Sequence, residues 1–380
     1  MHTSCFICGS EKIQLINFKG KNAFKCSSCK NTSFLHNPLK KKYVELIKGH
    51  KKIHFTVAAL IWRNKKLLMF DRTFWTFGFT VPSGHAERND SIQEAVKKEI
   101  NEETSLEVVS LKKLKELRLE WDYCSVGGTA HYWTVFEALV KGKPKETIES
   151  RKIKFYSLKE INKLKLNAAM RIVLINLNLI KARPLVLGIT SEFGMGKTTV
   201  AGIFEKLGAK KINADELAQK LFTEKKIKEK LRKEFSAGIF EGKEISRKKL
   251  AEIVFSNELK RKKLEKIIHP IVFSEMKKKI NEFKKRKAKL IVLDVPLLLE
   301  TNFRQLADQV LIVLSEKEEQ LKRLKKKGFT EKEIRERILA QKSIHEKIGF
   351  ADYVINNSFS LKEAKNNVKN LYNDLIKGVK

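Results

Sequence analysis

Residues 191–199 carry a pattern that binds phosphate groups. They read Ser-Glu-Phe-Gly-Met-Gly-Lys-Thr-Thr and match the spacing G-x-x-x-x-G-K-[ST], with serine in the first glycine position. In such a loop, backbone N–H groups at a helix start surround the phosphates, the lysine reaches the outer phosphates, and the next hydroxyl ligates Mg²⁺. The alternative is a chance glycine-rich turn. The sequence predicts a site for ATP and Mg²⁺ made by Gly194, Met195, Gly196, Lys197, Thr198 and Thr199.

Two carboxylates near this loop bear on its chemistry. Glu192 lies inside the loop, where its charge would repel a triphosphate unless the side chain points away. Asp215 ends the next predicted strand and could accept or orient the proton of a hydroxyl group. We therefore expect Asp215 to be a catalytic residue.

Three glutamates follow a spacing that places them on one face of a helix. Glu99, Glu102 and Glu103 fall at i, i+3 and i+4, and such side chains are neighbours on a helix surface. These like charges need a neutralising cation, and Mg²⁺ or Mn²⁺ prefers oxygen ligands. The ion could hold a pyrophosphate and activate water, with Glu102 and Glu103 as candidate catalytic residues. The alternative is a solvated acidic face.

Four cysteines form two C-x-x-C pairs near the N-terminus. Cys5 and Cys8 make the first pair, and Cys26 and Cys29 make the second. Two such pairs can close a tetrahedral Zn²⁺ site, which has no open position and therefore stabilises the fold. A redox pair is the alternative. Cys124 stands alone, and we interpret it as a small buried residue.

The elements that position these residues are visible in the pattern. Residues 54–62 and 65–70 read as strands, and a capping box at Ser91 and Glu94 begins a helix that runs to about Thr104. From Leu185 onward, short apolar runs alternate with Lys/Glu helices, which predicts a parallel α/β sheet. We expect three domains, over residues 1–40, 50–180 and 185–380, with residues 181–184 as a linker.

Composition narrows the class of partner. The 380 residues carry 79 Lys and Arg against 44 Asp and Glu, a formal charge of +35. This charge favours polyanions such as nucleotides or nucleic acid, although a lysine-rich surface is more often simply solvated. No apolar run reaches the length of a membrane span and no secretory signal is visible, so we expect a cytoplasmic protein with small-molecule substrates.

Residues 84–106 resemble the Nudix box, G-x5-E-x7-R-E-U-x-E-E-x-G-U, where U is a bulky aliphatic residue. The matches are Gly84, Glu99, Ile100, Glu102, Glu103 and Leu106. The resemblance covers about residues 50–180 and implies an α/β/α sandwich that hydrolyses nucleoside diphosphate derivatives, with the three glutamates as metal ligands. Asp90, Lys98 and Ser105 stand where the box has Glu, Arg and Gly. A domain that only binds is the alternative.

Residues 185–375 resemble dephospho-coenzyme A kinase in an ordered series of motifs. They include Asn-Ala-Asp ending at Asp215, His269-Pro270, Asp294-Val-Pro-Leu-Leu, and Gln320 with Arg323. The resemblance implies a P-loop fold with a helical lid. It also implies that this domain phosphorylates the 3′-hydroxyl of dephospho-CoA. It implies that Lys197 and Thr198 bind nucleotide and metal, that Asp215 is the base, and that Arg323 neutralises phosphoryl charge.

Several readings of these motifs stay open. His269 contacts substrate or shapes a helix, and Asp294 is a metal-shell carboxylate or a hydrogen-bond acceptor. The whole chain reads as a bifunctional enzyme with an N-terminal zinc ribbon. One alternative is a related nucleoside or nucleotide kinase with a binding-only Nudix domain. The other is a nucleic-acid-binding protein whose catalytic folds are regulatory.

Overall fold

The computed structural model describes most of the chain in two compact units. Unit 1 comprises Met1–Arg183, Ser191–Gly196 and Gln309–Lys380, and unit 2 comprises Pro184–Thr190 and Lys197–Asp308. The described residues are 13–18, 21–26, 32–34, 45–48, 51–73, 77–87, 90–124, 130–235, 237–242, 244–246, 249–250, 253–254 and 257–379.

The N-terminal strands of unit 1 form a small antiparallel sheet. Its order is β1-β2-β3, with bounds Ile13–Phe18, Lys21–Cys26 and Thr32–Phe34. Cys26 ends β2, but its side chain and the residues Cys5, Cys8 and Cys29 lie outside what the structure describes. The zinc ribbon therefore stays a prediction.

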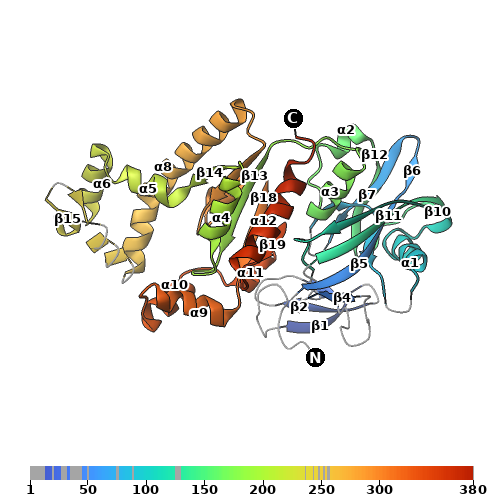
Figure 1. The fold of residues 1–380 in the computed structure, drawn as a ribbon, viewed down its shortest axis with the longest axis horizontal. Helices are drawn as coiled ribbons and strands as arrows, with labels where there is room; N and C mark the ends of the chain where they lie inside the picture. Colours follow the sequence, from blue (N-terminus) through green and yellow to red (C-terminus); the bar gives the residue numbers. More distant parts are fainter. Residues whose placement is uncertain are drawn as a thin grey trace. The chain divides into compact units, whose positions relative to one another are not determined.

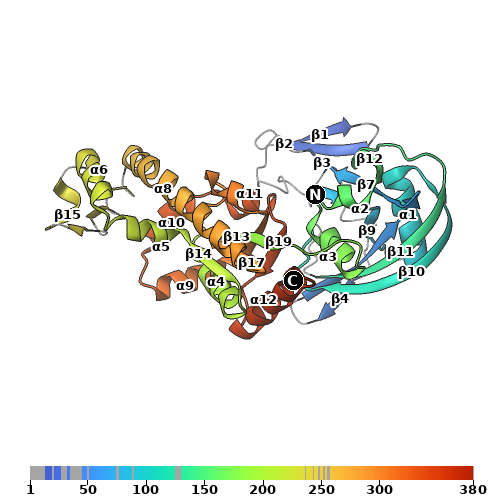
Figure 2. The same ribbon diagram turned by 90° about the horizontal axis from the view of Figure 1, so that it is seen from above.

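A mixed sheet in unit 1 supports the acidic helix. Its order is β10-β11-β5-β4, and β9 also pairs with β5; β11 runs parallel to β5. The bounds are β4 Glu45–Lys48, β5 Lys51–Leu60, β9 Ser83–His85, β10 Glu107–Leu119 and β11 Ala130–Lys141. Helix α1 (Ile92–Thr104) lies against β10 and β5, as Figures 1 and 2 show.

One face of this sheet packs on α1 because strand residues alternate between the two faces. Val57, Ala59, Phe136 and Ala138 contribute to a buried cluster with Val96, Ile100 and Leu106. Full burial of a valine, isoleucine, leucine or phenylalanine side chain stabilises a fold by about 1.5–3 kcal/mol. The opposite face of β5 and β11 carries the alternate residues, including His54 and His131, which are paired in register.

A second sheet of unit 1 has the order β12-β7-β6, with β8 paired to β7. The bounds are β6 Trp62–Arg63, β7 Lys66–Arg72, β8 Gly78–Thr80 and β12 Ser150–Tyr156. Helices α2 (Leu158–Ile161) and α3 (Ala168–Asn176) follow, and α3 contacts β8. These sheets and helices confirm the α/β architecture expected for this part of the chain.

The start and end of α1 follow local chemistry. The Ser91 hydroxyl accepts from the Glu94 N–H at 3.2 Å, and the Glu94 carboxylate accepts from the Ser91 N–H at 2.7 Å, so the predicted capping box is present. Ser105 ends the helix in the left-handed region, at φ 60° and ψ 23°. Glycine adopts this conformation without strain, whereas serine pays about 1 kcal/mol.

Unit 2 contains parallel strands with helices between them. Strands β13 (Leu185–Ser191), β17 (Leu290–Asp294) and β14 (Lys210–Asn213) pair in the order β14-β17-β13. Every residue of β13 and β17 is buried, as expected for strands covered on both faces. The helices are α4 Lys197–Lys206, α5 Ala214–Leu221, α6 Lys225–Phe235 and α8 Glu258–Lys285.

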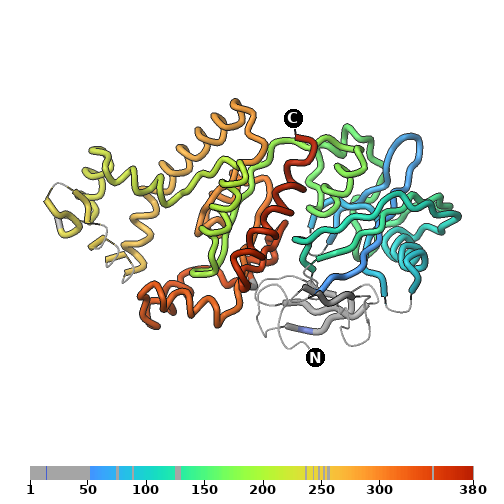
Figure 3. The backbone as a smooth tube through the Cα atoms, viewed as in Figure 1, coloured from blue at the N-terminus to red at the C-terminus, as the bar shows by residue number. Residues whose placement is uncertain are grey.

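Helix α8 is a continuous 28-residue helix despite the proline at position 270. Its buried residues, Ile268, Val272, Met276 and Ile280, recur every four positions and form one stripe. Figure 3 shows its backbone as one long orange coil. Unit 2 also has two short antiparallel strands, β15 Phe240–Glu241 and β16 Glu244–Ile245, and the 3₁₀ helices η1 Ala237–Ile239 and η2 Asn302–Leu306.

The C-terminal part of unit 1 has a parallel strand pair. Strand β18 (Gln309–Leu314) pairs with β19 (Tyr353–Asn356), so the parallel pairing expected from the sequence is confirmed here too. The helices are α9 Lys317–Lys326, α10 Glu331–Leu339, α11 Ile344–Ile348 and α12 Leu361–Ile376. Among the described residues no helix is both long and apolar enough to span a bilayer.

Candidate active sites

The predicted phosphate loop leaves β13 and enters α4 through two glycines in the left-handed region. Gly194 has φ +86° and Gly196 has φ +94°, a conformation in which residues with a Cβ are strained. A Cβ at residue 194 would lie 2.6 Å from Leu324, and one at residue 196 would overlap with the side chain of Asn357. Both glycines are therefore required by the backbone and by its close neighbours.

Glu192 does not need to face a bound phosphate. Its side chain is nearly buried, and one carboxylate oxygen accepts a hydrogen bond from the Gln320 amide at 3.0 Å. The same Gln320 amide nitrogen lies 2.7 Å from the Phe193 carbonyl oxygen. Helix α9 thus holds the Glu192 carboxylate and the loop backbone through one side chain.

Arg323 lies beside the loop that the sequence assigned to phosphate binding. Its guanidinium donates to the Asn357 carbonyl at 2.7 Å and pairs with Glu319 at 3.4 Å. The Asn357 amide in turn donates to the Met195 carbonyl at 3.0 Å. A chain of hydrogen bonds therefore runs from Arg323 through Asn357 to the loop.

A buried lysine supports the start of the loop. Lys347, which has no solvent-exposed area, donates to the Ser191 carbonyl at 2.8 Å and lies 3.5 Å from the Gln341 amide oxygen. Polar groups of this kind are costly to bury without a hydrogen bond. Sequence analysis missed Lys347, because its role depends on a partner 156 positions away.

Unit 2 brings Lys197 onto the carboxylate of Asp294. Lys197 is the first residue of α4, and Asp294 is the last residue of β17 and fully buried. The two side chains form an ion pair. Asn213, opposite Asp294 in the strand register, donates to the other carboxylate oxygen at 3.3 Å. Of the two roles considered for Asp294, the described contacts are those of a hydrogen-bond acceptor.

Asn213 also begins the helix that carries Asp215. Its side-chain oxygen accepts from the backbone N–H groups of Asp215 at 2.9 Å and Glu216 at 3.1 Å, which caps α5. An amide can donate to Asp294 and accept from the helix at once, whereas a carboxylate could only accept. The asparagine in place of aspartate therefore suits the contacts it makes.

Asp215 lies in the first turn of α5 and reaches solvent. Removal of water by the surrounding protein raises the pKa of its carboxyl; the nearby Lys197 opposes this rise, and Glu216 adds to it. The pKa of Asp215 is therefore raised although solvent still reaches its carboxylate.

The other predicted residues of the C-terminal part have simpler surroundings. Thr198 and Thr199 are exposed in the first turn of α4, and Met195 is buried. The His269 ring packs edge-on against Phe303, with 5.5 Å between ring centroids. Partial burial lowers the pKa of His269, while Glu265 raises it. These contacts favour the structural reading of His269.

The three glutamates of α1 have different surroundings. The Glu99 carboxyl group lies so close to Gly84 that a Cβ at residue 84 would overlap with it. Glu102 is exposed to solvent, and Glu103 is fully buried. Glycine at position 84 therefore allows the backbone of β9 to approach Glu99.

Glu103 fixes the strand that precedes the helix. Its Oε2 accepts from the Ser83 N–H at 2.8 Å, and its Oε1 lies 3.6 Å from the Arg72 guanidinium. Burial raises the pKa of Glu103 well above its usual value; Arg72 opposes the rise, and Glu99 and Glu149 add to it. Oε1 is buried and accepts no hydrogen bond from the described residues, so it could serve as a metal ligand.

Sequence analysis missed Arg72 and Glu149. Both lie outside the box and reach Glu103 only because β7 and the segment before β12 pair beside it. A basic residue within a strand and a glutamate in a loop carry no spacing signal that would have identified them.

Two of the residues that differ from the Nudix box pattern contact each other. The Lys98 ammonium lies 2.6 Å from the Asp90 carboxylate. Asp90 replaces the box's glutamate and Lys98 replaces its arginine, yet the opposite charges still meet. The pair links the segment before α1 to the middle of that helix.

Two family models match the chain. The model for dephospho-CoA kinase matches residues 185–363, and the model for the NUDIX domain matches residues 52–177. These matches confirm the two resemblances drawn from the motifs. Neither of these two ranges includes the N-terminal cysteine pairs.

Similar proteins match the C-terminal half. The dephospho-CoA kinase of Carboxydothermus hydrogenoformans is 38% identical over 186 residues, which are 48% of this chain and 90% of that protein. The dephospho-CoA kinase of Bacillus licheniformis is 39% identical over 184 residues, 48% of this chain and 92% of that protein. The solved structure of dephospho-CoA kinase from Campylobacter jejuni is 27% identical, covering 51% of this chain and 98% of that one, with a TM-score of 0.41.

Proposed function

Because the chain belongs to the dephospho-CoA kinase family, we propose that it transfers the terminal phosphoryl group of ATP to the 3′-hydroxyl of dephospho-CoA. In this reaction the hydroxyl oxygen bonds to the γ-phosphorus, the bond to the ADP oxygen breaks, and the hydroxyl proton leaves. The domain proposed for this activity is residues 185–380. The proposal assigns each part of the transfer to a residue of this domain.

The observation that carries the proposal is the grouping around Asp294. Lys197 pairs with Asp294, Asn213 donates to Asp294, and Asn213 caps the helix of Asp215. Asp215 is close enough to Lys197 for the lysine to act on its pKa. The proposed phosphate ligand Lys197 and the proposed base Asp215 thus lie near each other at the carboxyl ends of parallel strands, where α/β folds bind ligands.

The roles follow from the chemistry of each group. Residues 194–199 offer backbone N–H groups to the phosphates, and Lys197 moves from Asp294 to the outer phosphates when ATP binds. Asp215 accepts the proton of the attacking hydroxyl. Arg323 neutralises charge on the transferred group. Thr198 would hold Mg²⁺, which supplies further charge neutralisation at the phosphates.

The test follows ADP formation by the purified full chain. With ATP and Mg²⁺, dephospho-CoA should stimulate ADP formation and yield CoA, and a panel of nucleosides and nucleotides should not. A nucleoside or nucleotide that replaced dephospho-CoA would instead support the related-kinase reading. Lys197→Ala should remove the stimulated activity, while Lys249→Ala, a change at an exposed lysine elsewhere in unit 2, should leave it intact.

We propose a second activity for residues 50–180, the metal-dependent hydrolysis of a nucleoside diphosphate derivative. The α1 glutamates support it: Glu99 faces the Gly84 backbone, Glu102 is exposed, and one oxygen of Glu103 accepts no hydrogen bond from the residues that the structure describes. Glu99, Glu102 and Glu103 would hold Mg²⁺ or Mn²⁺, which would bind the pyrophosphate and acidify water. Arg72 orients Glu103 for this role.

Hydrolysis is tested with a panel of nucleoside diphosphate derivatives in the presence and absence of Mg²⁺. Phosphate or nucleoside monophosphate release that requires Mg²⁺ and is lost in Glu102→Gln supports the proposal. Tight binding of a nucleotide without turnover would favour the binding-only domain.

A further inference from the structure

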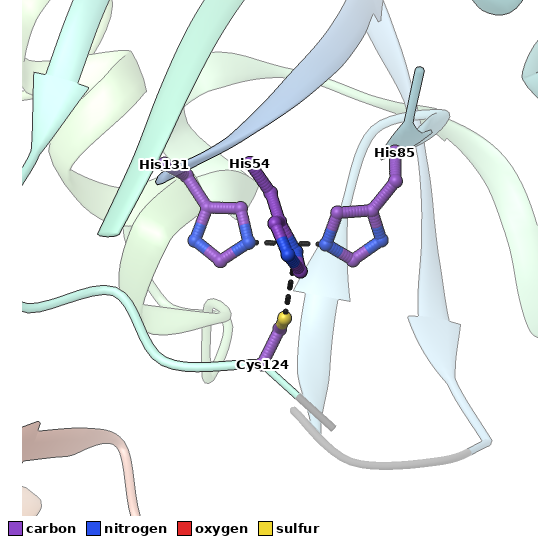
Figure 4. A group of neighbouring side chains, drawn as sticks. All are labelled: His54, His85, Cys124 and His131. Carbon is purple, nitrogen blue, oxygen red and sulfur yellow. Dashed lines mark hydrogen bonds between the residues drawn. The ribbon is translucent and has the colours of Figure 1, made fainter. Parts of the chain in front are cut away.

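A cluster of three histidines and one cysteine lies in unit 1, away from the α1 face of the mixed sheet. The residues are His54, His85, Cys124 and His131, and one ligand atom of each lies within 4.8 Å of those of the others. Figure 4 shows their side chains converging from three strands and from the segment after β10. Among the described residues, no other group of His, Cys, Asp and Glu side chains converges in this way.

The strand register explains how these residues meet. His54 of β5 lies opposite His131 of β11, and Thr56 of β5 lies opposite His85 of β9. Because side chains alternate along a strand, His54 and His131 share the face opposite the α1 core. Cys124 closes the group, with its sulphur 3.4 Å from the Nδ1 of His54.

Two of the separations between donor atoms are close to the edges of a tetrahedral zinc site, and all four donor atoms lie within 4.8 Å of one another. The Nε2 atoms of His85 and His131 lie 3.0 Å apart. In a tetrahedral zinc site with Zn–N near 2.0–2.1 Å and Zn–S near 2.3 Å, the edges would be about 3.3 Å between nitrogens and about 3.6 Å between nitrogen and sulphur. Both separations in the cluster are within about 0.3 Å of these edges.

One histidine of the cluster is oriented as zinc ligands are. The His131 Nδ1 lies 2.9 Å from the Asp122 carbonyl oxygen and 3.3 Å from the Asp122 carboxylate. Both partners are acceptors, so Nδ1 carries the hydrogen and Nε2 directs its lone pair into the cluster. Asp122 is itself held by the indole N–H of Trp133 at 2.8 Å. Such second-layer contacts fix the tautomer of metal-ligating histidines.

We propose that His54, His85, Cys124 and His131 form a closed, four-coordinate zinc site that ties the segment after β10 to β5, β9 and β11. Three nitrogens and one thiolate are the donor set of a borderline-soft ion such as Zn²⁺, and four protein ligands leave no position for a substrate. The site is therefore structural. It is separate from the N-terminal cysteine pairs and from the carboxylates of α1.

The interpretation of Cys124 as a lone buried residue is corrected by this cluster. Its sulphur faces histidines from β5, β9 and β11, whose positions in the sequence are 70, 39 and 7 residues away from it. No local spacing links these residues, so only the pairing of the strands could identify them.

The first experiment measures zinc in full chains in which Cys5, Cys8, Cys26 and Cys29 are all serine, so that Cys124 is the sole thiol. We expect about one zinc per chain, retained through dialysis. A second chain, which also carries Cys124→Ser and His131→Asn, should not retain zinc. A third chain, which instead carries His269→Asn and so lacks a histidine elsewhere, should retain it. Cobalt in place of zinc should give the visible bands of a tetrahedral site with one thiolate. Equal zinc in all three chains would overturn the proposal.

A second measurement uses the unaltered chain, in case the serine variants do not fold. Alkylation of Cys124, followed by mass mapping of the peptides, should be at least tenfold slower before treatment with a zinc chelator than after it. Restoring Zn²⁺ should restore the protection. Equal labelling of Cys124 with and without the chelator would reject the site, whatever the zinc content of the N-terminal cysteines.

Discussion

The protonation state of Asp215 decides whether this residue can act as the base in the proposed kinase reaction. The surrounding protein raises the pKa of its carboxyl, and the positive charge of Lys197 lowers it. Lys197, the proposed phosphate ligand, therefore also influences the protonation of Asp215. A proton on Asp215 would block its proposed role as a base.

The pH dependence of the kinase reaction tests this role. Because the pKa of Asp215 is raised, kcat/KM should fall as the pH drops through a value above the usual 3.9 or so of an aspartate. Asp215→Asn should lower kcat by about 10²–10⁴-fold and flatten this acid limb. Steady-state rates of both chains, measured from about pH 4.5 to about pH 8, check this prediction. An unchanged limb in the variant would assign the titration to another group.

The Asp90–Lys98 pair makes a prediction about stability. Lys98 is half exposed, so the pair should contribute only about 0.2–1 kcal/mol. Asp90→Asn and Lys98→Met should each lose that amount, and the double variant should lose no more than either single one in this term. A double-mutant cycle from urea unfolding measures the coupling energy. Fully additive losses would mean that the two side chains do not interact in solution.

At the scale of elements, helix α1 depends on its first turn. Its carboxylates keep their positions only if the helix begins at Ile92, and the Ser91–Glu94 capping box sets that start. Removal of the cap exposes backbone N–H groups that the hydroxyl satisfies.

We expect Ser91→Ala to destabilise α1 by about 1 kcal/mol and to lower the proposed hydrolysis several-fold. Ser157→Ala is a matched control, because it removes the same kind of capping box from α2, which carries none of the site glutamates. Hydrogen exchange should show faster opening of α1 amides in the first variant and of α2 amides in the second. Loss of hydrolysis in both variants would point to a general folding defect.

Sequence patterns predicted elements better than they predicted contacts. The glycines at 194 and 196, the α1 capping box and the parallel strands were all predictable, because local backbone chemistry or hydrophobic periodicity determines them. Asn357, Lys347 and Arg72 were not, because their partners lie 162, 156 and 31 positions away. Distance along the chain removes the signal that spacing provides.

At the scale of the whole molecule, the two proposed activities use different residues and should be separable. Lys197→Ala should abolish the kinase reaction and spare hydrolysis, and Glu102→Gln should do the reverse. Each variant serves as the folding control for the other, since the activity that remains reports an intact domain. Loss of both activities in a chain that still shows native circular dichroism would refute two independent sites.

The net charge gives a separate prediction. A formal charge of +35 should produce binding to a random oligonucleotide that weakens steeply as salt rises. We expect that binding to be weak at physiological salt, because lysine-rich surfaces make nonspecific phosphate contacts. Fluorescence anisotropy across a salt series measures it. Binding that stayed tight at physiological salt would favour a nucleic-acid partner over the enzyme.

Lys347 has a consequence for how the chain is made. The ribosome adds Ser191 long before it adds Lys347, and 156 positions separate them. At about 5–20 residues per second, this interval lasts about 8–30 s. During that time the Ser191 carbonyl lacks the hydrogen bond that Lys347 donates, so the start of the proposed phosphate loop is held only after Lys347 has been made.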